Sequence, residues 1–175
     1  MSRSTRRQAA SHVLASRLVD LLSIAGAAFA LDAASKWLIL NVVMQPPRAI
    51  PLLPVLDLTL GFNTGVSFGL FRDTLDDWAS AFSAFKLLVA ASLIAWALRT
   101  PQPLERAGLA LIAGGAIGNA VDRWRDGMVT DFIDLHWAGH HFPTFNLADV
   151  AITLGVGCVL LGASARPPSR DHAPI

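Results

Sequence analysis

Two aspartates in the second half of the chain could act together as an acid–base pair. Asp131 lies in "VTDFID", and Asp149 lies in "FNLADVAI", where an apolar run begins. Two carboxylates held close together cannot easily both ionise, so one can activate water while the other protonates or polarises a substrate carbonyl. The first turn of a helix favours a charged Asp149, which suits a base. The same position also fits a helix-capping role, and spacing alone leaves both interpretations open.

A second set of polar residues follows a glycine motif. "GGAIGNAVDR" places Gly114 and Gly118 at a spacing that lets a neighbouring helix approach closely. Asn119, Asp122 and Arg123 come directly after it, at the end of an apolar run. Polar groups at such a place are costly next to lipid, so this cluster must face something else.

An acid and a base stand one helical turn apart in the first apolar segment. Asp32 and Lys36 can meet on one face of a helix at this i, i+4 spacing. An opposite charge removes much of the cost of burying each group. We therefore interpret the pair as structural.

Histidines near the second set raise the question of a metal. His136 and His140 could bind zinc if their segment were helical, with a carboxylate as third ligand. Gly139 and Pro143 weaken such a helix, and the chain has no HExxH arrangement with its general base. We therefore expect no metal and no cofactor, and we interpret His136, His140 and His141 as solvated or interfacial side chains.

The composition of the chain indicates whether these residues lie in a water-soluble or a membrane protein. The chain has 175 residues, of which 53% are hydrophobic and 15% charged, and its mean hydropathy is +0.48. The charges stand between long apolar runs, a pattern typical of a membrane protein. Four runs are long enough to cross a bilayer, which takes about 20 helical residues. They are residues 18–40, 81–98, 104–121 and 145–165. We predict one integral-membrane domain, mainly α, over residues 1–175.

Arginines that flank these runs predict the orientation. One side, with both termini and the turn between the second and third runs, holds Arg3, Arg6, Arg7, Arg17, Arg99, Arg106, Arg166 and Arg170. The other side holds Arg48, Arg72, Arg123 and Arg125. The positive-inside rule therefore places both termini in the cytoplasm and segments 41–80 and 122–144 outside. The net charge of +1 is too small to suggest nucleic acid as a partner.

The outer segment before the second run has a different character. Residues 48–71 hold prolines, glycines and alternating apolar residues, which favour short strands and turns. A small sheet with open edges cannot sit in lipid, so we expect it at the outer surface. "RDTLDDWASAF", residues 72–82, suits a short interfacial helix. The tail, about residues 166–175, is expected to be disordered.

Five motifs in one order resemble a known family. "LDAASK", "NTGVSFG", "GGAIGNAVDR", "VTDFID" and "FNLADVAI" resemble the lipoprotein signal peptidase family, also called signal peptidase II, over about residues 18–165. The resemblance implies a bacterial intramembrane aspartic protease of the cytoplasmic (inner) membrane. Such an enzyme cuts diacylglyceryl-modified prolipoproteins just before the lipidated cysteine. Lipidated precursors and membrane lipids are then the expected partners, with a monomer as the expected state.

The resemblance also implies roles for individual residues. Asp131 and Asp149 would form the catalytic pair near the outer face. The substrate site would be lined by Asn63, Asn119, Arg123 and Asn146. Supporting positions would be Asp32, Lys36, Asp122, Gly115 and Gly118. The 48–71 sheet would cradle the substrate, and there this chain has Val66 and Ser67 where the family often has two alanines.

Two other classes of function deserve comparison. A small transporter could use Asp32, Lys36 and the aspartates as a proton relay, but it predicts charges near the midplane and an internal repeat, and neither is evident. A purely structural scaffold would give Asp131, Asn146 and Asp149 no reason to converge. We therefore expect a protease.

Overall fold

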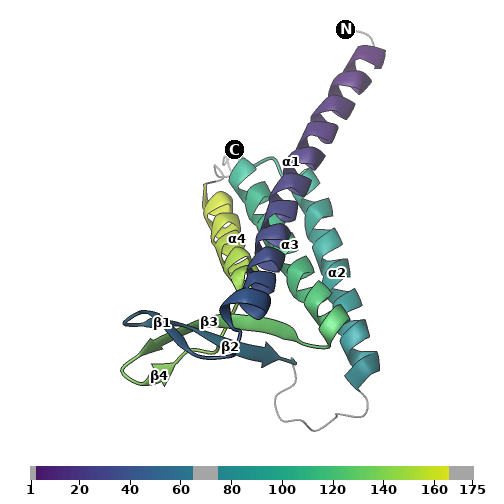
Figure 1. The fold of residues 1–175 in the computed structure, drawn as a ribbon. Helices are drawn as coiled ribbons and strands as arrows, with labels where there is room; N and C mark the ends of the chain where they lie inside the picture. Colours follow the sequence, from purple (N-terminus) through teal and green to yellow (C-terminus); the bar gives the residue numbers. More distant parts are fainter. Residues whose placement is uncertain (1–2, 65–74, 166–175) are drawn as a thin grey trace, which may run out of the picture.

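The computed structural model describes residues 3–64 and 75–165. In these residues the chain forms four long helices with a small sheet across one end (Figure 1). The helices are α1 (Arg3–Leu38), α2 (Leu75–Arg99), α3 (Pro103–Asp126) and α4 (Leu147–Ser164), and a short π-helical stretch, η1 (Ile39–Val43), continues α1. The prediction of a mainly helical chain with a small sheet is confirmed.

Helix α3 lies at the centre of the bundle and packs against each of the other three helices. Small residues make this possible. A Cβ added to Gly108 would lie 2.5 Å from the carbonyl oxygen of Gly155 on α4, and one added to Gly114 would overlap the carbonyl oxygen of Ala25 on α1. Close backbone approach through glycine is typical of helices that pack in membranes.

The outer surfaces of the helices are apolar. Large side chains that are exposed by half or more include Leu31 and Trp37 on α1, Phe85 and Leu88 on α2, and Leu154, Leu160 and Leu161 on α4. A surface of this kind is unusual for a water-soluble domain and suits contact with lipid.

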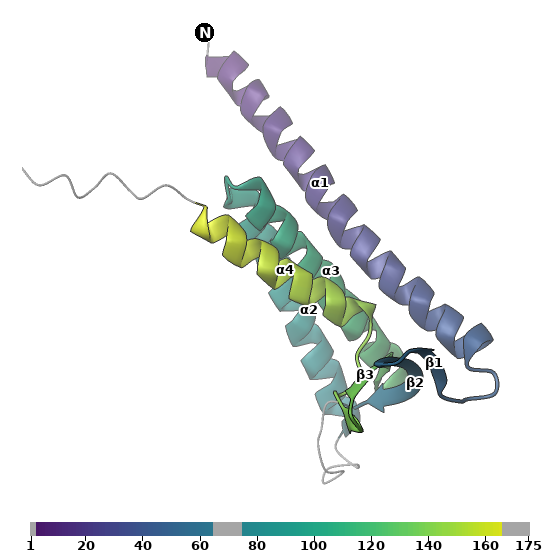
Figure 2. The same cartoon turned by 90° about the vertical axis from the view of Figure 1, so that its left-hand side faces the viewer.

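Among the residues that the structure describes, two helices are long and apolar enough to be candidate membrane spans, whereas we predicted four. They are Ser11–Val43 and Leu147–Ser164. The first is much longer than the predicted span of residues 18–40, because the helix begins in the basic N-terminal segment. Figures 1 and 2 both show this N-terminal part of α1 extending beyond the other helices.

The sheet has four antiparallel strands in the order β1-β2-β3-β4: β1 (Ile50–Leu53), β2 (Leu56–Asn63), β3 (Val129–Trp137) and β4 (His140–His141). Strands β1 and β2 fall in the predicted 48–71 segment. Strands β3 and β4 do not, because they come from the outer segment 122–144, for which we predicted no strand. That part of the prediction is wrong: β3 pairs with β2 from Val129 to Leu135, with a shift in register between Leu58 and Gly61, and Gly61 lies opposite Asp131.

Helix α2 differs from the prediction at its start. We expected a short interfacial helix at residues 72–82, separate from the span, but α2 runs without a break from Leu75 to Arg99. The reason is local, since this sequence contains neither glycine nor proline to interrupt the helix. The remainder of the expected interfacial segment lies outside the described residues. So do Val66, Ser67 and the tail 166–175.

Candidate active site

The predicted site residues converge where the helix ends meet the sheet. Strand β3 contributes Asp131, α4 contributes Asp149 and its N-cap Asn146, α3 contributes Asn119, Asp122 and Arg123, and α1 contributes Asp32 and Lys36. Figure 1 shows the start of α4 and the ends of α1 and α3 beside β3.

Asn146 and Asp149 form a reciprocal cap at the start of α4. The backbone N–H of Asp149 donates to Oδ1 of Asn146 (3.1 Å), and the backbone N–H of Asn146 donates to Oδ2 of Asp149 (3.2 Å). This capping box satisfies two N–H groups that a helix start leaves without partners. The capping role that the sequence left open for Asp149 is therefore present, and it holds the carboxylate in a defined place.

The same asparagine also holds the second carboxylate. Since Oδ1 of Asn146 is occupied by the cap, its Nδ2 points the other way and donates to Oδ1 of Asp131 (2.7 Å). Nδ2 also reaches the carbonyl oxygen of Thr130 at 3.3 Å. Asn146 is fully buried, so this geometry cannot relax into water. One residue thus binds both predicted catalytic aspartates.

Asn119 links this pair to α1. Its Nδ2 donates to Oδ1 of Asp149 (2.9 Å), while its Oδ1 accepts from Nδ2 of Asn146 (3.0 Å) and from Nζ of Lys36 (3.1 Å). A lysine ammonium can only donate, so it must face the amide oxygen. Lys36 therefore fixes which end of the Asn119 amide faces Asp149.

Lys36 is a buried cation that contacts several members of the network. Its Nζ lies 2.7 Å from Oδ2 of Asp32 and 2.8 Å from Oδ2 of Asp122, and only 3% of the residue is exposed. The other oxygen of Asp32 accepts from the backbone N–H of Ala148 (2.9 Å) in the first turn of α4. The predicted Asp32–Lys36 pair is present, and it also ties α1 to α3 and α4.

Two glycines of α3 make room for these contacts. A Cβ on Gly118 would lie 2.5 Å from Oδ2 of Asp32, and one on Gly115 would lie 2.5 Å from the carbonyl oxygen of Ala148. Any side chain at either place would push apart the groups that hold the start of α4. The supporting role expected for Gly115 and Gly118 thus has a steric basis.

Arg123 and Asn63 lie at the sheet side of the site. The Arg123 guanidinium is buried, and its Nη2 donates to the backbone carbonyl of Asn63 at the end of β2 (3.4 Å). Asn63 itself is exposed. This contact joins the end of α3 to the sheet next to Asp131.

The environment of Asp131 favours its protonated form. Burial raises the pKa of Asp131 above its ordinary value, and the nearby negative charge of Asp149 raises the pKa further. Hydrogen bonds from Asn146 and Asn63 and the positive charge of Lys36 act in the opposite direction without cancelling the rise. Asp149, in contrast, is half-buried, accepts hydrogen bonds from two N–H donors and lies at the positive end of the α4 dipole.

The histidines lie on a hairpin away from this network. Ala138 and Gly139 form its two-residue turn with positive φ angles of 49° and 81°, so His136 and His140 sit on strands and the helical spacing needed for zinc is not formed. His136 faces Asp57 at 3.3 Å, and His141 binds Asp134 at 2.9 Å. Among the residues that the structure describes, no group of three potential metal ligands gathers.

Sequence reasoning missed several backbone partners in the network. Ala148 N–H donates to Asp32, Thr130 N–H donates to Oδ2 of Asp122 at 3.4 Å, and the Thr130 carbonyl accepts from Asn146. Main-chain groups carry no residue-type signal, so no sequence pattern could have identified them.

The fold and the site together define a class of protein. A helical bundle with an apolar surface holds two carboxylates side by side in unlike environments, an arrangement that suits acid–base hydrolysis at a membrane.

Comparison with known proteins identifies the family. The family model for signal peptidase (SPase) II matches residues 24–164. The chain is 40% identical over 145 residues to the lipoprotein signal peptidase of Syntrophotalea carbinolica, with 81% of this chain and 88% of the relative covered. It is 42% identical over 149 residues to that of Solibacter usitatus, with 82% and 89% covered. The chain belongs to the signal peptidase II family, which is a family of proteases. The resemblance is confirmed, and transport and scaffold functions are set aside.

Two solved structures share the fold. Both are described as bacterial membrane enzymes determined by the in meso method, one at 2.3 Å and one at 1.9 Å resolution. The first has a TM-score of 0.69 and 23% identity, with 89% of this chain and 94% of that chain covered. The second has the same TM-score and 24% identity, with 85% and 94% covered.

Proposed function

We propose that this chain removes signal peptides from lipid-modified prolipoproteins, with Asp131 and Asp149 as its catalytic pair. The observation that carries this proposal is the double role of Asn146, whose Nδ2 lies 2.7 Å from Asp131 and whose backbone N lies 3.2 Å from Asp149. A buried asparagine that binds both carboxylates keeps them close enough to act on one water and one peptide bond.

The two environments assign different roles in the reaction. Asp149 takes a proton from water as the water oxygen attacks the scissile carbonyl, and Asp131 donates its proton to the carbonyl oxygen. The tetrahedral intermediate then collapses as the proton on Asp149 passes to the leaving amine and one hydroxyl proton of the intermediate returns to Asp131, which restores both carboxyl groups. The raised pKa of Asp131 supports its role as the protonated partner. Asn119 and Asn146 line the site and position the carboxylates.

The residues that we assign to substrate binding lie at the sheet side of the site. Asn63 is exposed at the end of β2, and Arg123 lies against its backbone. We assign both to the substrate, with the sheet as a cradle for the backbone around the cleavage site. The substrate proposed is a diacylglyceryl-modified precursor that is cut just before its lipidated cysteine, acted on by a monomer.

All four helices are proposed to span the bacterial inner membrane, with both termini in the cytoplasm. The apolar outer surfaces of α1, α2 and α4 support this placement, as does the arginine distribution. Helix α3 has 24 residues, or about 36 Å, which exceeds the hydrocarbon thickness of about 30 Å. The sheet and the catalytic pair then lie near the outer face, where water can enter.

The experiment is cleavage of a purified lipidated precursor by the purified enzyme in detergent. Asp131→Asn and Asp149→Asn each keep the side-chain size but remove the ionisable group, so each should lower turnover by at least about 100-fold. The double variant should be little worse than either, because residues that act as a unit lose their effect together.

Asp57→Asn is the matched control, since Asp57 is on the same sheet but faces His136. It should cleave normally. Near-normal cleavage by a well-folded Asp131→Asn or Asp149→Asn enzyme would refute the catalytic pair.

A further inference from the structure

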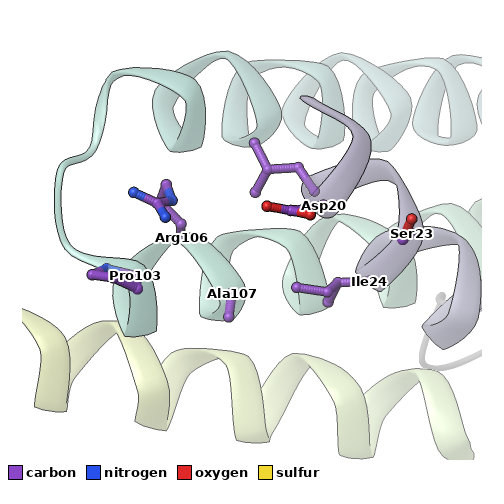
Figure 3. A pocket seen from close by; sticks show the side chains of 7 residues that line it. Asp20, Ser23, Ile24, Pro103, Arg106 and Ala107 are labelled. Carbon is purple, nitrogen blue, oxygen red and sulfur yellow. The ribbon is translucent and has the colours of Figure 1, made fainter. Parts of the chain in front are cut away.

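A cavity lies at the far end of the bundle from the catalytic pair, between α1 and the first turns of α3. Its volume is about 370 Å³, and it is lined by Asp20, Leu21, Ser23, Ile24, Pro103, Arg106 and Ala107. This volume is within the range of small-molecule sites, about 300–1,000 Å³. Figure 3 shows the Asp20 carboxylate and the Arg106 guanidinium on opposite sides of the same space.

The two charged groups in this cavity, Asp20 and Arg106, do not form an ion pair with each other. Within residues 3–64 and 75–165, no ion pair joins Asp20 to Arg106 at 4.0 Å or less. Arg106 is held by its Nη1, which donates to the carbonyl oxygens of Pro101 (3.0 Å) and Thr100 (3.5 Å). A guanidinium has five N–H donors, so this anchoring leaves others for a ligand.

The rest of the surroundings are apolar. Leu21, Ile24 and Ala107 line the cavity wall. The same turns carry apolar side chains that are exposed on the outer surface: Val19 at 62%, Leu22 at 55% and Leu104 at 42%. A ligand here meets a positive group, a negative group and a surface that suits acyl chains.

We propose that this cavity binds the headgroup of a phospholipid that carries a primary ammonium beside its phosphate, as phosphatidylethanolamine does. Arg106 binds the phosphate, and Asp20 accepts hydrogen bonds from the ammonium. This site rests on the membrane placement proposed above, which puts the cavity at the cytoplasmic face of the bilayer. It is independent of the catalytic pair, so cleavage can be measured separately.

The test compares two lipids that differ only in the ammonium. Purified protein in detergent is mixed with equal amounts of phosphatidylethanolamine and phosphatidylcholine of identical acyl chains, and bound lipid is counted by native mass spectrometry. Both lipids have a phosphate and no net charge, but only the ethanolamine has N–H donors. An exposed charged contact supplies up to about 1 kcal/mol, so we expect a two- to about fivefold preference for phosphatidylethanolamine.

Three variants sharpen the result. Asp20→Asn should abolish the preference, Arg106→Gln should weaken the binding of both lipids, and Arg99→Gln should change neither. Arg99 is the matched control because it lies near the same end of the bundle but outside the cavity.

Equal binding of the two lipids to the unmodified protein would overturn the proposal, as would a preference that survives Asp20→Asn. Displacement of bound phosphatidylethanolamine by free phosphoethanolamine at the same concentration would instead indicate a site for a soluble zwitterion, and would also overturn it. We expect the Asp20→Asn enzyme to cleave a lipidated precursor normally, and this assay tests the proposed catalytic function separately from lipid binding.

Discussion

The contacts of Asp32 make a sharp prediction for the variant Asp32→Asn. In the native chain both carboxylate oxygens accept from donors: Oδ2 from Nζ of Lys36 at 2.7 Å, and Oδ1 from the backbone N–H of Ala148 at 2.9 Å. An asparagine offers one acceptor oxygen and one NH₂ group. Whichever way the amide turns, a donor faces a donor, in a residue that is only 1% exposed.

The expected loss of folding free energy depends on which contacts of Lys36 remain in the variant. Loss of a hydrogen bond to a charged group costs about 1.5–3 kcal/mol, and breaking a buried ion pair outright costs about 3–5 kcal/mol. Lys36 keeps Asp122 at 2.8 Å, so we expect the lower end of the second range, about 3 kcal/mol. For a chain of this size, that corresponds to a Tm lower by about 6–12 °C.

The measurement is thermal unfolding in detergent, followed by tryptophan fluorescence, with cleavage assayed well below the Tm. Asp57→Asn serves as control, because Asp57 is half-buried and outside the network, and it should shift the Tm by less than about 2 °C. If Asp32→Asn leaves the Tm unchanged while turnover falls steeply, the pair takes part in the chemistry and our structural interpretation is wrong.

Three further predictions concern the pKa of Asp131, the packing at Gly118 and the effect of a chelator. Asn63→Ala removes a hydrogen bond that lowers the pKa of Asp131, so the pKa of Asp131 should rise further. The alkaline limb of the pH–activity profile should then move to higher pH. Asn41→Ala, the control, should leave the alkaline limb where it is. Gly118→Ala forces a Cβ against the Asp32 carboxylate and should destabilise by about 1–3 kcal/mol, measured by Tm, whereas Gly26→Ala, which meets no atom within 4 Å, should not. EDTA should leave cleavage unchanged, and a loss restored by zinc would contradict the two-carboxylate mechanism.

The sign of the first of these predictions follows from the proposed roles. In the proposed mechanism activity requires a protonated Asp131, so activity should fall with rising pH as Asp131 loses its proton. Because the folded pKa of Asp131 lies above its unfolded value, the protonated form is also the one that folding favours. Stability from this group is therefore present at acid pH and lost as the pH rises through the folded pKa. An alkaline limb that moves to lower pH in Asn63→Ala would refute this assignment.

Short-range patterns in the sequence predicted much of the helical part of the site. The i, i+4 spacing of Asp32 and Lys36 predicted a contact that the structure shows at 2.7 Å. The position of Asp149 at the start of an apolar run predicted a first-turn residue, and the capping box confirms that location. Both predictions needed only the geometry of one helix.

Contacts between distant segments could not be predicted in the same way. Lys36 and Asn119 are 83 residues apart, and Asn119 and Asn146 are 27 apart. Strand β3 was missed for a related reason. Its polar residues Thr130 and Asp131 are buried by partners from α3 and α4, so the strand lacks the alternation of apolar and polar residues that marks a half-exposed strand.

The path from Lys36 to Asp149 shows how a buried cation can orient the carboxylate that we propose as the base without touching it. A lysine in direct contact with a carboxylate stabilises its negative charge and so reduces its affinity for a proton. Lys36 makes such contacts with Asp32 and Asp122, whereas it reaches Asp149 through Asn119, at 3.1 Å and then 2.9 Å. The neutral amide transmits orientation but not a full charge. Asp149 is thereby held in place by a neutral group and not by direct contact with the lysine, which fits the role proposed for it.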